Sequence, residues 1–144
     1  MGPADRVPFP LLAQVPRELR GVILDFRWDL ARLHALDLPA REVATEELAW
    51  HLPLPFWAAD GAPFQVSPMQ VMRDPARYAD QWRRTLDADL DIPLDCRIGQ
   101  GGRLTILDGV HRLLKATASG RRTVEVRVLS DADLDRIAVP RESS

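Results

Sequence analysis

The chain is notable first for what it has little of: cysteine, lysine and long apolar runs. Its only cysteine among 144 residues, Cys96, excludes an internal disulfide bond and a cysteine-based zinc site. No apolar run approaches the roughly 20 residues of a membrane-spanning helix, so we expect no membrane partner. The N-terminus carries only Arg6 before a short, proline-interrupted apolar run, which makes a poor signal peptide. These absences favour a cytoplasmic protein.

A basic surface is also absent. The formal net charge is −2, the arginines are scattered, and Lys115 is the only lysine. Proteins dedicated to nucleic acids usually carry a basic stripe, so the charge argues against a nucleic-acid partner. With 46% hydrophobic and 28% charged residues, and no repeat or Gly/Ser linker, the composition is that of an ordinary globular protein with one core.

The most informative stretch reads RLTILDGVHRLLKA, from Arg103 to Ala116. Apolar and polar residues alternate at its start, which predicts a strand. Asp108 and Gly109 then interrupt the alternation, and the following residues have helical spacing. On that helix the polar side chains lie at i, i+3, i+4 and i+7 and form one stripe: Asp108, His111, Arg112 and Lys115.

Two interpretations of this stripe stand side by side. Taken singly, each residue favours a structural role: Asp108 as an N-cap, Gly109 as a tight turn, and the cations as a solvated helix face. Taken together, an acid, an imidazole and two cations at a helix N-terminus favour an anion-binding site, since free N–H groups and the helix dipole attract anions there. The pattern as a whole predicts a phosphate-binding site.

The segment from about Phe64 to Leu129 resembles the ParB/sulfiredoxin-like domain, and its Asp-Gly-x-His-Arg core is closest to the free-serine-kinase branch. In that family ParB proteins bind CTP and DNA, sulfiredoxins use ATP to repair a cysteine sulfinate, and the kinases transfer phosphate to an amino acid. The matching elements are Pro68-Met69-Gln70, a helix over Asp74–Leu86, a strand pair over Asp95–Leu107, the turn Gly109-Val110-His111-Arg112, and a closing strand Thr123–Leu129.

The resemblance implies a nucleotide-binding protein, a small-molecule phosphotransferase that uses ATP or ADP, with CTP possible, together with Mg²⁺. Its partners would be the nucleotide and a small-molecule acceptor. Asp108 would be the base, and His111 the second catalytic residue. No side chain is assigned as a metal ligand. The residues expected to contact the nucleotide are Gly109, Val110, His111, Arg112, Lys115 and Gln70.

The chain departs from the family pattern at two positions. The kinases have Pro-His-Glu where this chain has Gln70, and glutamine cannot act as a base. Three acids of the N-terminal part were considered as replacements: Glu46, Glu47 and Asp60. Sulfiredoxins have a cysteine where Val110 stands, so we do not expect sulfinate repair. Cys96 itself is expected to be a buried, inert thiol.

ParB proteins continue into a DNA-reading domain, whereas this sequence ends about fifteen residues after its last expected strand. Direct DNA reading is therefore not expected. The alternative function is a non-catalytic nucleotide-sensing or nucleic-acid-binding regulatory module.

The expected fold class is α+β, a small mixed sheet with packed helices. Residues 1–63 would form a helical and aromatic extension packed on the core, residues 64–139 the nucleotide-binding core, and residues 140–144 a tail. The extension would hold an extended lead-in over residues 1–17, a helix over Leu19–Leu36 with a strand at Val22–Phe26 as the alternative, and a short helix capped by Thr45. His34 is assigned no role.

The remaining expectations concern the aromatic loop and the core. The loop Trp50–Trp57 would either pack in the core or cover a ligand. The core would hold a strand at Phe64–Val66, a hairpin loop at Gly99–Gly102, and a helix ending at Gly120. Ser130 would cap a last helix that ends before Pro140.

Overall fold

The structure, a computed structural model, describes residues 6–141. Its main sheet has the strand order β1-β6-β4-β5. The strands are β1 (Ala40–Ala44), β4 (Leu94–Ile98), β5 (Leu104–Asp108) and β6 (Thr123–Leu129). β6 pairs antiparallel with β1 and parallel with β4, while β4 pairs antiparallel with β5. The α+β class with a small mixed sheet is therefore confirmed.

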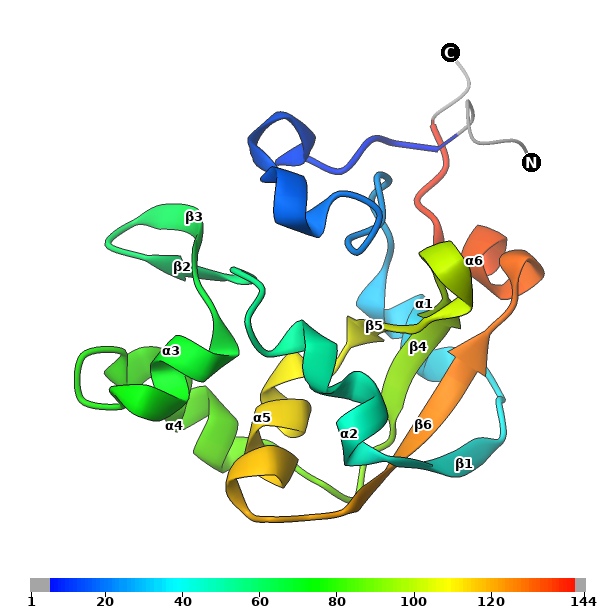
Figure 1. The fold of residues 1–144 in the computed structure, drawn as a ribbon. Helices are drawn as coiled ribbons and strands as arrows, with labels where there is room; N and C mark the ends of the chain where they lie inside the picture. The colour runs from blue at the N-terminus through cyan, green and yellow to red at the C-terminus, as the bar shows by residue number, and fades with distance from the viewer. Residues whose placement is uncertain (1–5, 142–144) are drawn as a thin grey trace.

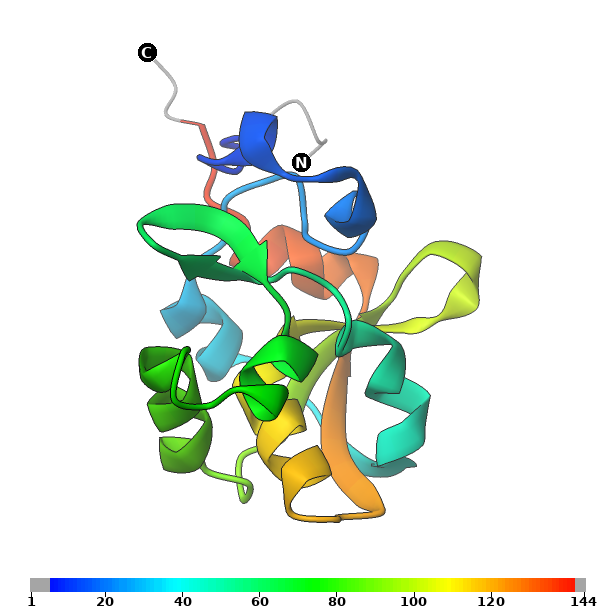
Figure 2. The same cartoon turned by 60° about the vertical axis from the view of Figure 1, so that its left-hand side comes forward.

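Helices pack around this sheet, and a separate hairpin stands beside them (Figures 1 and 2). The helices are α1 (Leu30–Ala35), α2 (Thr45–Leu48), α3 (Pro68–Arg73), α4 (Ala79–Asp87), α5 (Val110–Ala118) and α6 (Asp131–Ile137). The hairpin consists of β2 (Trp57–Ala59) and β3 (Ala62–Val66). Short 3-10 turns lie at Leu12–Gln14, Arg17–Leu19, Ala49–His51 and Gln100–Gly102. No helix in the described range is long and apolar enough to cross a membrane.

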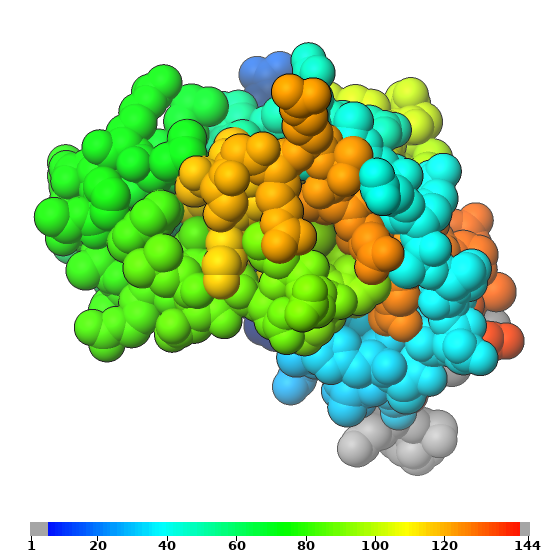
Figure 3. Space-filling view, turned by 90° about the horizontal axis from the view of Figure 1, so that it is seen from below, coloured from blue at the N-terminus to red at the C-terminus, as the bar shows by residue number. Residues whose placement is uncertain are grey.

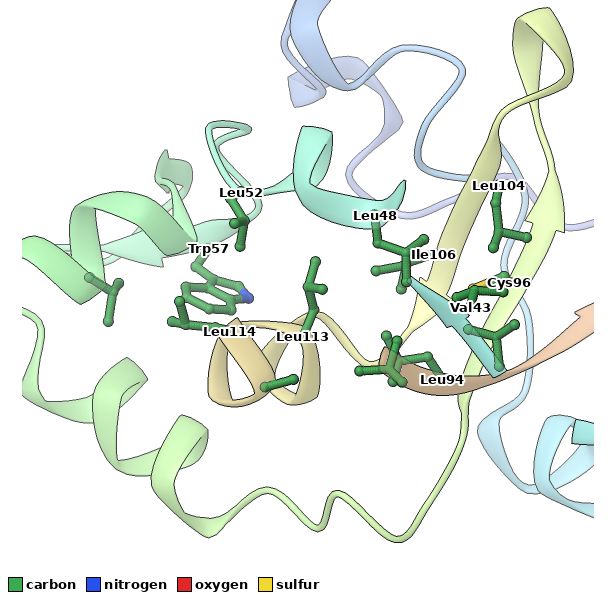
Figure 4. Packing of buried hydrophobic residues seen from close by; sticks show 14 of the residues in the cluster. Val43, Leu48, Leu52, Trp57, Leu94, Cys96, Leu104, Ile106, Leu113 and Leu114 are labelled. Carbon is green, nitrogen blue, oxygen red and sulfur yellow. The ribbon is translucent and has the colours of Figure 1, made fainter. Parts of the chain in front are cut away.

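Apolar side chains pack against both faces of the sheet because the strands alternate. Val124 and Val126 of β6 belong to the larger cluster, which residues of α2, α3 and α5 complete, whereas Leu129 joins a second cluster with α1 and α6. Figure 4 shows the larger cluster, with Leu48 of α2 beside Ile106 of β5. Each fully buried leucine contributes about 1.5–3 kcal/mol through loss of contact with water.

The junction of β5 and α5 requires glycine. Gly109 has φ 123°, a conformation that side chains with a Cβ rarely adopt. A Cβ at this position would also lie 2.9 Å from Cγ of Leu94 and 3.1 Å from Nη2 of Arg112. The expected turn from a strand into a helix is confirmed here, and the tight packing holds α5 against β4.

The expected helix over Leu19–Leu36 is wrong over most of its length. Only residues 30–35 are helical, with Asp29 as the N-cap accepting a hydrogen bond from the Ala31 N–H. Gly21 instead adopts φ 78°, and the Arg97 guanidinium donates to the carbonyls of Gly21 and Val22. This long-range contact overrides the helical spacing. The alternative strand at 22–26 is reduced to isolated bridges.

Pro68-Met69-Gln70, for which the sequence predicts no particular secondary structure, lies in a helix, α3. Two further elements differ from expectation. The next helix, α4, begins at Ala79 rather than at Asp74, since Asp74 accepts hydrogen bonds from the Arg77 and Tyr78 N–H groups in a preceding turn. Thr45 is the first residue of α2 and not its cap, because β1 continues to Ala44 and the Thr45 N–H donates to the Arg122 carbonyl.

The hairpin β4–β5 and the two helices after it follow the expectation. The loop at residues 99–102 joins β4 to β5. α5 ends at Ala118 with Ser119 as its C-cap and Gly120 following at φ 72°, and Ser130 caps α6. β1, which falls within the expected extension 1–63, forms one edge of the main sheet. Of the expected tail, residues 142–144 lie outside the described residues, as do residues 1–5 of the lead-in.

Candidate functional site

A cavity of about 640 Å³ lies at the N-terminal end of α5. Its walls come from α1, the start of β2, the segment between α4 and β4, the strands β4, β5 and β6, and the first turn of α5. Figure 3 shows that this connecting segment (lime) lies on the surface between α4 (green) and residues of the 30–45 region (cyan). The lining residues are His34, Trp57, Ala88, Asp89, Ile92, Pro93, Asp95, Leu107, Asp108, Gly109, Val110, His111, Arg112 and Arg127.

Asp108 is the last residue of β5, and its carboxylate is only partly exposed. Oδ2 accepts a hydrogen bond from Nη2 of Arg112 at 3.1 Å and lies 3.9 Å from Nε2 of His34. The N-cap of α5 is Gly109, and no side chain caps this helix. The structural interpretation of Asp108 as an N-cap is therefore wrong, and its carboxylate is available to the cavity.

His111 is held between an aromatic ring and an amide. Its ring stacks on Trp57 with centroids 4.2 Å apart and an interplanar angle of 11°. Because the Gln81 Oε1 can only accept, the His111 Nε2–H donates to it at 2.9 Å. Burial lowers the pKa of His111 to about 4, with a smaller lowering by Arg84 and an opposing effect of Asp108. At neutral pH His111 is therefore an uncharged hydrogen-bonding group.

The Arg112 guanidinium makes its hydrogen bonds to other residues of this chain. Its Nη1 donates to the carbonyls of Ile92, at 3.1 Å, and Pro93, and its Nη2 donates to Asp108. The side chain is 11% exposed. The guanidinium thus joins three parts of the cavity wall: the segment before β4, the end of β5 and the first turn of α5. Its observed contacts make it the group that positions Asp108.

Lys115 and Gln70 do not line the cavity. The Lys115 Nζ donates to the carbonyls of Leu86 and Ala88, each at 2.7 Å, and so pairs with the C-terminal end of α4. The Gln70 side chain accepts from the Ser67 N–H within a capping box of α3 and is exposed. Of the predicted site residues, the cavity brings together Asp108, Gly109, Val110, His111 and Arg112.

The sequence reasoning missed an ion pair that attaches α1 to the sheet. Nε of Arg127 donates to Asp95 at 2.7 Å, and both side chains are largely buried. The same guanidinium donates to the carbonyls of Leu33 and Leu36, at the end of α1. The strict alternation of β6 places Arg127 on the face opposite Val126, and that was the available signal. Its partners were not predicted, because two of them are backbone carbonyls and the third, Asp95, lies on another strand.

Two other cavity residues were missed or left open. His34, which was assigned no role, lies beside Asp108. For Trp57 the packing role is seen, since it is 8% exposed within the larger cluster, and it also lines the cavity. Figure 4 shows its ring beside Leu114.

Other titratable groups of interest lie elsewhere. Glu46 and Glu47 do not line this cavity, and Asp60 lines a second one between the β2–β3 turn and α4. Burial raises the pKa of Cys96 to about 12, so its thiol is unreactive. Among residues 6–141 no group of three or more His, Cys, Asp or Glu side chains is arranged to hold a metal ion.

Comparison of the chain with protein-family models, with curated proteins and with solved structures finds no match. The ParB/sulfiredoxin resemblance therefore stays a prediction from the motif.

Proposed function

We propose that this protein has a ParB/sulfiredoxin-like fold, binds a nucleotide in the cavity beside α5, and acts as a small-molecule phosphotransferase that uses ATP or ADP. One observation carries the proposal: the Asp108 carboxylate is not used as a helix cap and lies where β5 meets the N-terminus of α5, in a cavity of about 640 Å³. Small-molecule sites commonly measure roughly 300–1,000 Å³. A base at the edge of an anion-attracting helix end suits phosphoryl transfer.

The phosphates would be held mainly by the backbone. The first turn of α5 supplies the N–H groups of Val110, His111 and Arg112, which no side chain caps, and the helix dipole adds positive potential. Apolar residues of the same cavity, Ile92 and Leu107, offer a wall for the nucleoside. The sequence expectation added the side chains of His111, Arg112 and Lys115 to these N–H groups, but those side chains make hydrogen bonds within the protein.

In this proposal Asp108 accepts the proton of the acceptor hydroxyl as that oxygen attacks phosphorus. Arg112 holds the carboxylate and prevents it from turning away. Mg²⁺ in phosphoryl transfer is usually held by one or two carboxylates and the substrate phosphates, where it neutralises charge. Asp89 fits that need, since its carboxylate lines the cavity and accepts only the Asp91 N–H within the described range.

A second candidate, a non-catalytic nucleotide-sensing module, is favoured by a separate observation. Both arginines that line the cavity, Arg112 and Arg127, are already paired with carboxylates, and His111 is neutral. With no unpaired cationic side chain among these three residues, we expect the cavity to bind a nucleotide with modest affinity. For nucleic acids, the net charge of −2 predicts no retention of duplex DNA at physiological salt and micromolar protein. Tight retention in a gel-shift assay would reverse this ranking.

The test is a nucleotide and metabolite screen. ATP, ADP or CTP with Mg²⁺ should raise the melting temperature, since a ligand at 100 times its Kd adds about 2.7 kcal/mol. Each nucleotide that binds is then incubated with small hydroxyl-bearing metabolites, and ADP or AMP formation is measured. Acceptor-dependent formation supports the phosphotransferase, and binding without it supports the sensing module. No stabilisation at millimolar concentration contradicts both.

A further inference from the structure

His34 reaches the cavity from a part of the chain far from the motif. It lies on α1, 74 residues before Asp108 in sequence, and its Nε2 lies 3.9 Å from Asp108 Oδ2. The imidazole is 56% exposed and the carboxylate 33% exposed. The two side chains therefore lie at the mouth of the cavity. The His34 imidazole is largely in contact with water, and the Asp108 carboxylate lies beside the first turn of α5.

The position of His34 is built into the fold. The neighbouring Leu33 is fully buried, and its carbonyl accepts a hydrogen bond from Arg127. On the outer side of the helix the Arg32 guanidinium donates to the Ala138 carbonyl. α1 is thus attached both to the sheet and to the end of α6. The imidazole is presented to Asp108 by a fixed helix and not by a loose surface segment.

A second basic group is what the proposed chemistry lacks. A carboxylate that accepts the hydroxyl proton must pass it to another group before the next turnover. Gln70 cannot replace a second carboxylate, and the acids considered for that role lie outside the cavity. His34 is the uncommitted imidazole beside Asp108 among the described residues, since His111 donates to Gln81.

We propose that His34 is the positioning residue of Asp108 and the group that receives its proton, an inference that rests on the proposed function. His34 and Arg112 both approach Oδ2, which leaves Oδ1 without a partner among residues 6–141 and open to the acceptor hydroxyl. As the new O–P bond forms and the P–O bond to the leaving nucleotide breaks, the hydroxyl proton moves to the carboxylate. It then passes to neutral Nε2 of His34 and on to water.

Among residues 6–141, Asp108 is the carboxylate that lies within 4 Å of the His34 imidazole. The cavity presents to it these further titratable or charged groups: Arg112 from α5, Arg127 from β6, Asp95 from β4, Asp89 from the segment before β4, and His111 from α5. Of these, the two arginines are paired with carboxylates. On α1 itself Arg32 lies 3.7 Å from Asp29, and on α6 the acids Asp133 and Asp135 pair with Arg136 and Arg6.

The first experiment needs no substrate. Proton NMR of the three histidines, assigned by substitution, follows the His34 ring in wild type, Asp108→Asn and the control Asp37→Asn, which removes an exposed carboxylate close in sequence. Removal of the carboxylate should change the ring chemical shifts of His34 in Asp108→Asn and leave them unchanged in Asp37→Asn. Equal His34 shifts in wild type and Asp108→Asn would overturn the pairing.

The second experiment uses the acceptor that the metabolite screen finds. His34→Gln should fold normally, because the side chain is exposed, and should bind nucleotide like wild type. Its kcat should fall by roughly tenfold to a hundredfold, less than for loss of the base itself, with KM unchanged. The acid limb of the pH–rate profile should disappear as well. Ala35→Gln, on an exposed position of α1 outside the cavity, is the matched control.

An unchanged kcat and pH profile in His34→Gln would overturn the inference while leaving the phosphotransferase intact. Absence of any nucleotide binding would instead overturn the proposed function. The NMR comparison of wild type with Asp108→Asn would still decide whether His34 and Asp108 interact. The two failures are therefore distinguishable.

Discussion

The imidazole of His51 accepts a hydrogen bond from the backbone N–H of Ile106 at 3.0 Å, through Nε2, while its Nδ1–H donates to the Leu48 carbonyl at 2.8 Å. β5 is an edge strand of the main sheet, so this N–H has no strand partner on its outer side. A buried N–H without an acceptor is costly. A fully buried side chain from the turn after α2 thus completes the sheet edge that leads into the candidate site.

We predict that His51→Ala lowers the free energy of unfolding by about 3 kcal/mol. The substitution leaves a cavity in the core and removes the acceptor of the Ile106 N–H, and each effect costs on the order of 1–3 kcal/mol. Urea unfolding followed by circular dichroism measures the change. His34→Ala is the control, since its exposed ring should cost less than about 0.5 kcal/mol. Equal unfolding midpoints for His51→Ala and wild type would show that the two hydrogen bonds contribute nothing.

Stability should also fall in mildly acidic solution. Burial lowers the pKa of both His51 and His111 to about 4, below the value near 6.5 of a histidine in the unfolded chain. The unfolded chain therefore binds more protons in this range. The stability contributed by each neutral imidazole is fully present above pH 6.5 and is lost as the pH falls from 6.5 toward 4. Each histidine should cost about 1–2 kcal/mol between pH 7 and pH 5.

Urea unfolding at pH 7, 6 and 5 measures this loss. In His111→Gln the decrease between pH 7 and pH 5 should be smaller by about 1–2 kcal/mol, because one of the two histidines no longer titrates. Ala35→Gln, at an exposed position of α1, should retain the wild-type dependence within about 0.5 kcal/mol. A stability that is flat from pH 7 to pH 5 would mean that neither buried ring resists protonation.

The two cations of the α5 stripe should behave differently from each other. Lys115→Met removes two hydrogen bonds to the end of α4 and should cost about 1 kcal/mol of stability, with nucleotide binding unchanged. Arg112→Ala should lower both the stability and the nucleotide affinity, because it removes the hydrogen bonds that hold the segment before β4 and the Asp108 carboxylate. Thermal melting with and without ATP or ADP separates the two effects. An equal nucleotide shift in both variants would place Arg112 outside the site.

The sequence predicts the elements whose structure depends only on residues close together in the chain. The alternation of β5 and β6, the turn at Gly109 and the cap at Ser130 each depend on neighbouring residues, and all were predicted. The end of α5 was predicted to within one residue, since its C-cap is Ser119 and not Gly120. β1 was not, because only Val43 of its five residues is buried and no alternation marks it.

The contacts of the candidate site, in contrast, join residues that are far apart in the sequence. Arg112 and Lys115 bind backbone carbonyls of residues 86–93, and a carbonyl has no signature in the sequence. The pairing of His34 with Asp108 joins α1 to β5 through tertiary packing, which residue spacing along the chain does not record. The residue types of the site were predictable, but their partners were not.

Asp108→Asn distinguishes catalysis from binding. Asparagine has nearly the same shape, its amide oxygen can still accept from Arg112, and Gly109 remains the helix cap. We therefore expect a stability loss of about 1 kcal/mol or less for the lost charge-assisted hydrogen bond. Nucleotide binding should be retained or slightly tighter, because a negative charge next to the phosphates is removed.

Turnover should respond in a different way, because an amide cannot accept the acceptor's proton. If Asp108 is the base, kcat should fall by about 10²–10⁴, the usual contribution of a positioned base. The measurements are a melting curve, a nucleotide titration and a turnover assay with the acceptor from the screen, and Asp37→Asn is the control carboxylate outside the cavity. Wild-type turnover in Asp108→Asn would contradict the proposed base, since nothing else about the variant would compensate for the lost proton acceptor.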